Sequence, residues 1–179
     1  LSLKNNIQQI PLVDNNGKLV GLEVFKELLK SKTRTNKVVL MAGGLGSRLR
    51  PLTDNKPKPM LHVGNKPILE TIIENFAKHG FTEIILSVNY LSHVIKEYFG
   101  DGSKFGVNIE YIQEEKRLGT AGALSLMRDQ LKEPFFVSNA DLLTNVNYEH
   151  LLKFHNQMNA NATMCVREYD FQVPYGVVN

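Results

Sequence analysis

The segment VVLMAGGLGSRLRPLT at residues 38–53, with KPKPM close behind at residues 56–60, decides the fold of this chain. Its first four residues are apolar and stand between Lys37 and a cluster of glycines. This pattern predicts a buried strand that runs into a tight loop. We expect that loop to form the functional site.

The loop combines three glycines with two cations. Gly43, Gly44 and Gly46 let the backbone adopt positive φ and let a ligand lie against the main chain, where N–H groups can point at phosphate oxygens. Arg48 adds a planar guanidinium that suits phosphate, and Lys58 adds a mobile point charge. The segment therefore predicts a polyphosphate-binding site.

Two better-known glycine loops do not fit these residues. A P-loop requires Gly-Lys-Ser/Thr, whereas Gly46 is followed by Ser47 and Arg48. A dinucleotide-binding fingerprint needs a third glycine where Leu49 stands. The spacing thus argues against a P-loop enzyme and against a Rossmann oxidoreductase.

The same segment resembles the sugar-phosphate nucleotidyltransferases, which make nucleotide-sugars. Their pattern is Ala-Gly-Gly-x-Gly-x-Arg-Leu-x-Pro-Leu-Thr and then Lys-Pro-Met or Lys-Pro-Leu, and residues 42–53 and 58–60 match it. The resemblance implies a three-layer α/β/α Rossmann-like nucleotide-diphospho-sugar transferase fold with a mainly parallel sheet. It implies catalytic roles for Arg48 and Lys58, with Lys56 as the rival of Lys58, and nucleotide binding by Ala42, Gly43, Gly44, Gly46 and Ser47.

Three later segments extend the resemblance. NAD at residues 139–141 resembles the family's Asn-Gly-Asp, whose aspartate binds magnesium, with Ala140 in place of the glycine. Gln113 and LGTAGA at residues 118–123 resemble base-recognition elements, and PYGVV at residues 174–178 resembles a segment that lies along the sugar. The implied roles are Mg²⁺ binding by Asp141, base binding by Gln113, Gly119 and Thr120, and sugar contacts by Asn139, Tyr175 and Gly176.

Taken singly, each of these residues has a structural interpretation. An aspartate after a strand is most often a turn residue, and a glycine-threonine pair commonly opens a helix. The functional interpretation is favoured because the glycine loop, Gln113 and Asp141 each follow a different predicted strand. In a parallel sheet, the carboxyl ends of the strands share one edge, and ligands bind there.

Strands and helices alternate from Lys37 onward, which favours a parallel sheet with right-handed crossovers. Asn65 is expected to cap the helix that follows it, and Gly80 to end that helix. After it we expect strands at 84–88, 107–112, 135–138 and 163–166, and helices at about 92–98, 121–131 and 148–158.

Residues 1–30 are expected to form a separate piece, followed by a polar linker at 31–36 and the nucleotidyltransferase domain at 37–179. Two short apolar stretches flank the turn DNNG at residues 14–17, with a short helix expected at 24–29. This piece resembles the closing half of a CBS repeat, a regulatory module that often binds adenine nucleotides. A CBS-type regulatory module is therefore one alternative function, and a cytidylyltransferase with a related glycine loop is another.

Composition sets broad limits. The chain has 179 residues, 42% of them hydrophobic, and a formal net charge of +3. It has no run of five or more basic residues, which argues against nucleic acid or a membrane as partner. Cys165, the single cysteine, is expected to pack in a strand. The five histidines lack metal-ligand spacing. We expect a cytoplasmic protein, and a homo-oligomer is compatible with the sequence.

The resemblance implies a reaction. A sugar 1-phosphate attacks the α-phosphorus of a nucleoside triphosphate in line, with Mg²⁺ as cofactor, and pyrophosphate leaves. The segment EEKRLGTAGAL at residues 114–124 looks most like the mannose-1-phosphate guanylyltransferase branch, which favours GTP. Family members carry further sugar-binding residues and a second metal-binding aspartate downstream, so we expect this chain, which ends at Asn179, to hold an incomplete sugar site.

Overall fold

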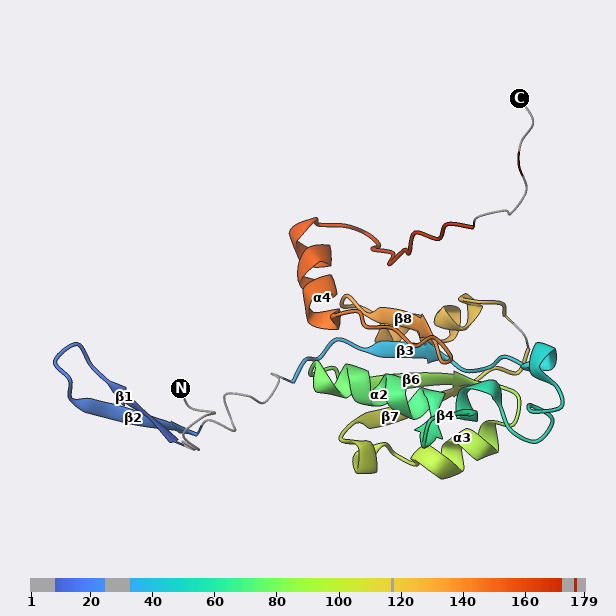
Figure 1. The fold of residues 1–179 in the computed structure, drawn as a ribbon, viewed down its shortest axis with the longest axis horizontal. Coiled ribbons are helices and arrows are strands. Elements are labelled where there is room, and N and C mark those ends of the chain that lie inside the picture. The colour runs from blue at the N-terminus through green and yellow to red at the C-terminus, as the bar shows by residue number, and fades with distance from the viewer. Residues whose placement is uncertain (1–8, 25–32, 117, 172–175, 177–179) are drawn as a thin grey trace. The chain divides into compact units, whose positions relative to one another are not determined.

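The computed structural model describes residues 9–24, 33–116, 118–171 and 176, and the chain divides into two compact units between Val146 and Asn147. Figure 1 labels the helices and strands along the chain. With η for a 3-10 helix, they are β1 (Gln9–Val13), β2 (Leu19–Val24), β3 (Val38–Met41), η1 (Ser47–Leu49), η2 (Lys58–Met60), β4 (His62–Val63), β5 (Lys66–Pro67), α2 (Ile68–Lys78), β6 (Glu83–Val88), α3 (Ser92–Phe99), η3 (Ser103–Phe105), β7 (Asn108–Gln113), η4 (Gly122–Gln130), β8 (Phe136–Asn139) and α4 (Tyr148–Gln157).

The central sheet has four parallel strands in the order β7-β6-β3-β8. After β3 the chain adds β6 and then β7 on one side, and it returns to place β8 on the other side of β3. The direction of winding therefore changes between β3 and β8, whose last residues, Met41 and Asn139, are paired. In open α/β sheets, ligands bind beyond the carboxyl ends of the strands at such a point.

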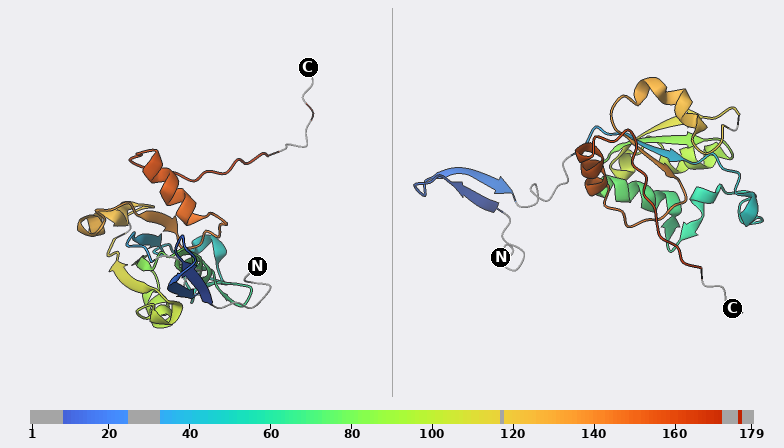
Figure 2. Two further views of the ribbon diagram at one scale, coloured as in Figure 1. Left: turned by 90° about the vertical axis from the view of Figure 1, so that its left-hand side faces the viewer. Right: turned by 90° about the horizontal axis from the view of Figure 1, so that it is seen from above.

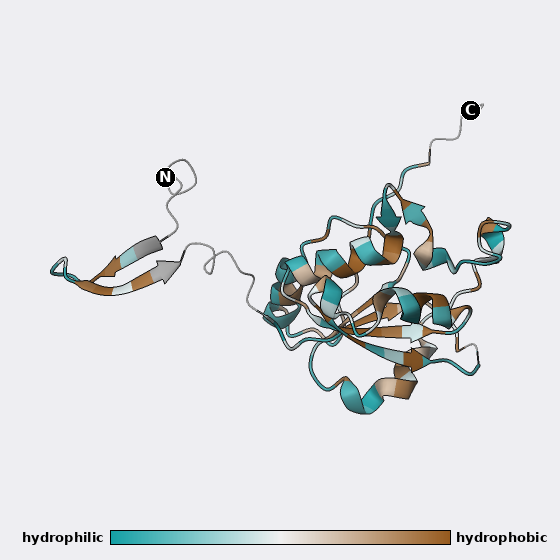
Figure 3. Ribbon diagram, turned by 90° about the horizontal axis from the view of Figure 1, so that it is seen from below, coloured by the Kyte–Doolittle hydropathy of each residue, from teal (hydrophilic) through white to brown (hydrophobic). Residues whose placement is uncertain are grey.

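The two inner strands, β3 and β6, are apolar because both of their faces are covered. Val39 and Ile85 pack against Ala123 and Met127 of η4 on one face. On the other face, Phe76 of α2 packs against Phe136 of β8 with ring centroids 5.7 Å apart. Figures 2 and 3 show the sheet between these layers, with the apolar residues gathered along the strands. The predicted three-layer α/β fold with a mainly parallel sheet is confirmed.

Helix α2 ends where the sequence predicts and begins later. Gly80 has a φ of +84°, its N–H donates to Ala77 O, and the N–H of Phe81 donates to Phe76 O, a closing motif that glycine favours. Asn65 does not cap the helix, so that prediction is wrong. Residues 64 and 65 instead form the turn of the β4–β5 hairpin, and the helix starts only after Pro67, at Ile68.

Two further predictions are wrong. The helix expected at 121–131 is a pair of 3-10 segments that meet at a kink, because Met127 has the non-helical angles φ −127° and ψ 19°. The strand expected at 163–166 is absent, and residues 161–171 carry no regular structure. Met164 and Val166 are each 82% exposed, so no neighbour covers these apolar residues, and Cys165 is exposed rather than packed.

The amino-terminal piece contains the expected pair of strands. β1 and β2 form an antiparallel hairpin, and Asp14 Oδ1 accepts hydrogen bonds from the N–H groups of Asn16 and Lys18 in the turn. The helix expected at 24–29 falls largely outside the described residues. None of the helices that the structure describes is both long and apolar enough to cross a membrane.

Candidate active site

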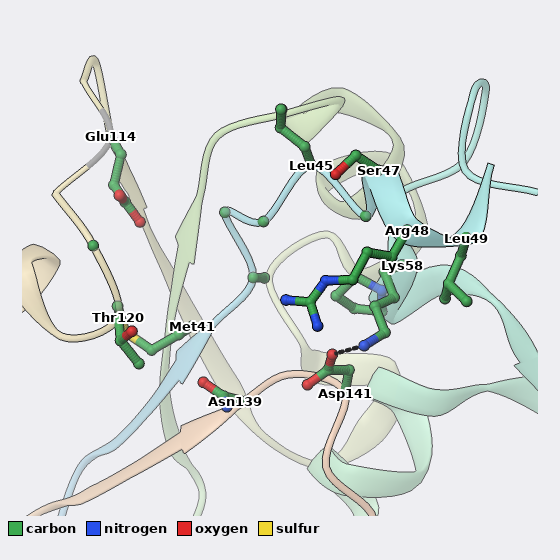
Figure 4. A pocket seen from close by; sticks show the side chains of 16 residues that line it. Met41, Leu45, Ser47, Arg48, Leu49, Lys58, Glu114, Thr120, Asn139 and Asp141 are labelled. Carbon is green, nitrogen blue, oxygen red and sulfur yellow. Dashed lines mark ion pairs between the residues drawn. The ribbon is translucent and has the colours of Figure 1, made fainter.

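A cavity of about 730 Å³ opens beyond the carboxyl ends of β3 and β8, where the winding of the sheet changes direction. This volume is within the usual range for small-molecule sites. The lining combines the glycine loop with cationic, acidic and amide side chains, as Figure 4 shows. The lining residues are Met41, Ala42, Gly43, Gly44, Leu45, Gly46, Ser47, Arg48, Leu49, Lys58, Pro59, Glu114, Gly119, Thr120, Asn139 and Asp141.

The glycine loop is held in a fixed shape by Thr53. Gly46 has a φ of +65°, and its carbonyl oxygen accepts a hydrogen bond of 2.9 Å from Thr53 Oγ1. Thr53 is 1% exposed, and its methyl group packs closely against Gly46. Within the described part of the chain, the backbone N–H groups of residues 43–47 donate to no protein acceptor. Such a row of N–H groups can bind an anion.

Cations and a carboxylate meet on the side of the cavity next to this loop. Lys58 Nζ lies 2.5 Å from Asp141 Oδ2, and Figure 4 shows the Arg48 guanidinium directed toward the same place. Lys58 opens η2, whose next two residues are buried, and this anchors its backbone. Lys56, its rival in the sequence, is exposed and does not line the cavity.

Asp141 is positioned by the strand before it. The N–H of Ala140 donates to Met41 O at 3.1 Å, so the pairing of β8 with β3 continues to the residue before the carboxylate. Ala140 is 1% exposed, and a small side chain suits that place. The Asp141 side chain is 26% exposed and reaches the cavity.

Most of the predicted site residues line the cavity: Ala42, Gly43, Gly44, Gly46, Ser47, Arg48, Lys58, Gly119, Thr120, Asn139 and Asp141. Gln113 does not. Its side chain is exposed, and Gln113 Oε1 accepts a hydrogen bond from Lys96 Nζ at 3.2 Å. Tyr175 lies outside the described residues, and Gly176 is exposed.

Glu114 lines the cavity and was not among the predicted site residues. It is 7% exposed, and its Oε1 accepts a hydrogen bond of 2.6 Å from Ser87 Oγ. Because neighbouring residues at a strand end point to opposite faces of the sheet, Glu114 faces the cavity while Gln113 faces α3. The local sequence pattern does not separate the two, because Asn108 and Glu110, which alternate with Glu114 along the strand, are exposed.

The donors of the cavity suit a magnesium ion only together with a ligand. Among the described residues there is no group of three or more His, Cys, Asp or Glu side chains that could hold a metal. Mg²⁺ is commonly held by one or two carboxylates plus substrate phosphates. Asp141, beside a loop suited to phosphates, fits that pattern as a single protein ligand.

The chain is similar to known nucleotide-sugar enzymes. Residues 37–179 match the family model described as nucleotidyl transferase. A probable mannose-1-phosphate guanylyltransferase of Oryza sativa is 41% identical over 147 residues, which are 79% of this chain and 41% of the rice protein. The mannose-1-phosphate guanylyltransferase catalytic subunit beta of Dictyostelium discoideum is 40% identical, with 79% and 40% covered. The chain thus spans about 41% of the length of such relatives.

The chain is also similar to solved structures. HddC from Yersinia pseudotuberculosis in complex with GMP-PN matches with a TM-score of 0.60 and 30% identity, over 68% of this chain and 54% of that one. A putative glucose-1-phosphate thymidylyltransferase from Bacillus anthracis matches with a TM-score of 0.61 and 28% identity, over 68% and 50%. With its own glycine loop, cations and aspartate in one cavity, the chain belongs to the nucleotidyl transferase family.

Proposed function

We propose that this chain carries the nucleotide-binding part of an enzyme that transfers a guanylyl group from GTP to a sugar 1-phosphate, with mannose 1-phosphate as the favoured acceptor. One observation carries the proposal. A loop of unpaired N–H groups, two cations and an aspartate line a single cavity where the winding of the sheet changes direction. The choice of GTP and mannose is supported by the names of the relatives.

The reaction exchanges one phosphoanhydride bond for another. A phosphate oxygen of the sugar 1-phosphate forms a bond to the α-phosphorus of GTP, the bond from the α-phosphorus to the bridging β-oxygen breaks, and pyrophosphate leaves with both electrons. The attacking oxygen is already anionic at neutral pH, so no general base is required. Catalysis then rests on positioning the phosphates and on stabilising their charge.

Each group in the cavity has a role in this scheme. The N–H groups of residues 43–47 would bind the triphosphate, Arg48 would hold the leaving pyrophosphate, and Lys58 would contact phosphates at the reacting centre. Lys58 is paired with Asp141, so a phosphate would share or compete for the Lys58 ammonium. Mg²⁺ held by Asp141 would neutralise phosphate charge.

The remaining predicted residues complete the proposal. Gly119 and Thr120 would contact the base, with Gln113 close to them in the chain, and Asn139, Tyr175 and Gly176 would contact the sugar. We also propose that residues 1–30 are the tail of a CBS repeat, joined by residues 31–36 to the catalytic domain at 37–179. Location in the cytoplasm and assembly into a homo-oligomer are proposed with it.

Pyrophosphate release from GTP tests the proposal, measured with mannose 1-phosphate and Mg²⁺ on an intact enzyme that contains this chain. Arg48→Ala should lower the rate about 100-fold or more, because a charge that stabilises the leaving group is lost. Arg50→Ala is the matched control: Arg50 is exposed, pairs with Asp54 and does not line the cavity.

A second matched pair separates the two lysines. Lys58→Ala should lower the rate as strongly as Arg48→Ala, and Lys56→Ala should leave it within about twofold of the original. Equal rates for the Arg48 and Arg50 variants would contradict the proposal, and so would sugar-independent release of pyrophosphate.

A further inference from the structure

The two cations of the cavity are joined by a stretch of chain without helix or strand. Residues 50–57 connect η1, which carries Arg48, to η2, which begins at Lys58, and they form turns and bends. η2 is anchored by its two buried residues, whereas all three residues of η1 are exposed. The position of Arg48 therefore depends on how the chain on either side of η1 is held.

A tyrosine from a distant part of the chain holds this connection. Tyr90 lies in the turn between β6 and α3, and its hydroxyl donates a hydrogen bond of 2.9 Å to Asp54 O. Of the hydrogen bonds that join described residues, this is the one that ties residues 50–57 to a part of the chain outside 46–60. The Tyr90 hydroxyl thus fastens an otherwise local loop to the central sheet layer.

The effect of this bond can reach η1 through the backbone. The N–H of Asp54 donates to Pro51 O at 3.2 Å, and the N–H of Leu52 donates to Leu49 O at 3.0 Å. The ion pair between Arg50 and Asp54 is largely exposed to solvent, and such a pair contributes little. A shift of Asp54 is therefore passed to η1 by successive backbone turns.

The turn that carries Tyr90 is itself held in place. Asn89 Nδ2 donates to Glu114 O at 2.7 Å, just beyond the end of β7. Leu91, directly before α3, has a φ of +48°, a left-handed conformation that costs an L-residue energy. A residue keeps such a conformation only where the surrounding contacts hold it there. The Tyr90 side chain therefore starts from a fixed backbone.

We propose that Tyr90 is a positioning residue, whose hydroxyl holds Asp54 and thereby keeps the Arg48 guanidinium directed into the cavity, where Figure 4 shows it. This inference rests on the proposed function, in which Arg48 holds the leaving pyrophosphate. Tyr90 is not among the residues that line the cavity, so it would act through Arg48 and not on the substrates. A displacement of about 1 Å at a catalytic group can lower a rate about 100-fold.

The test removes only the hydroxyl. In an intact enzyme that contains this chain, Tyr90→Phe should lower the kcat of pyrophosphate release about fivefold or more, the loss expected from one hydrogen bond. Tyr98→Phe is the matched control, because the Tyr98 hydroxyl donates to Glu70 Oε2 away from the cavity. Its kcat should stay within about twofold of that of the unaltered enzyme.

A double-mutant cycle separates positioning from a general loss of structure. In the Arg48→Ala background, Tyr90→Phe should change kcat by less than about twofold, because the group that Tyr90 positions is already gone. A fall of the same size in both backgrounds would show that Tyr90 only stabilises the fold, and it would overturn the inference. An unchanged kcat in Tyr90→Phe alone would overturn it as well.

Limited proteolysis tests the tether without reference to activity. Each basic residue within 46–60 except Arg48 precedes a proline, where trypsin does not cut, so the Arg48–Leu49 bond reports on η1. Its cleavage should be about threefold or more faster in Tyr90→Phe than in the unaltered enzyme or in Tyr98→Phe. An equal rate would overturn the inference and leave the proposed function standing. Failure of the unaltered enzyme to release pyrophosphate would overturn the proposed function itself.

Discussion

Replacement of Gly46 by alanine should destabilise the fold through the glycine loop. An alanine Cβ would lie 2.9 Å from Thr53 Cγ2 and 3.1 Å from Thr53 Cβ. Thr53 is 1% exposed and bonded to the Gly46 carbonyl, so it cannot turn away without breaking that bond. The φ of +65° alone costs an L-residue about 1–2 kcal/mol, and overpacking adds about 1–3 kcal/mol. We expect the free energy of unfolding to fall by about 2–5 kcal/mol.

Gly44→Ala is the matched control for this loss. A Cβ on Gly44 would meet nothing within 4 Å, and its φ is not positive. Its free energy of unfolding should stay the same or rise by up to about 1 kcal/mol, because alanine restricts the unfolded chain. Urea denaturation followed by circular dichroism measures both variants. Equal stability of the two variants would refute the reasoning from Thr53.

Two other predictions test corrected or unpredicted features. Asn147 Oδ1 accepts a hydrogen bond from the N–H of His150 at the start of α4, so Asn147→Ala should lower the free energy of unfolding by about 1 kcal/mol. Asn65 caps no helix, so Asn65→Ala should change the free energy of unfolding, measured by thermal denaturation, by less than about 0.5 kcal/mol. A larger loss from Asn65→Ala would show that Asn65 does act as a helix cap. Burial and the nearby Asp101 raise the pKa of Tyr111 to about 12. Because the folded state favours the protonated phenol, the free energy of unfolding should fall as the pH rises from 10 to 12. Urea titrations at pH 9 and 11 measure this fall, and Tyr111→Phe should lessen it. An equal fall in Tyr111→Phe would contradict the prediction.

The two inner strands, β3 and β6, were predictable from the sequence because they are buried on both faces. Val38, Val39 and Leu40 are fully buried, and such continuous apolar runs between turn signals identify parallel strands. The observed strands β6, β7 and β8 begin and end within one residue of the prediction. The alternation of strands and helices predicts a parallel sheet, in which the carboxyl ends of the strands share one edge. The glycine loop and Asp141 could therefore be placed together at that edge from the sequence.

The failures depend on contacts that a local pattern does not contain. Asn65 has the right residue type for a helix cap, but His62 pairs with Pro67, so residues 62–67 form a β-hairpin and not the start of a helix. The run from Thr163 to Val166 is mainly apolar, as a buried strand would be, yet no strand of the described chain pairs with it. Gln113 and Glu114 are adjacent polar residues at a strand end, and only the packing of β7 shows that Glu114 is the one that faces the cavity.

The central claim is that the α-phosphorus of the triphosphate is transferred to the sugar phosphate. The most direct test incubates an intact enzyme that contains this chain with mannose 1-phosphate, Mg²⁺ and GTP labelled at either the α- or the γ-phosphorus. The account predicts that the α-label appears in the nucleotide-sugar and the γ-label in pyrophosphate. Transfer of the γ-label to the sugar phosphate, or release of the α-label as free GMP or GDP, would contradict it.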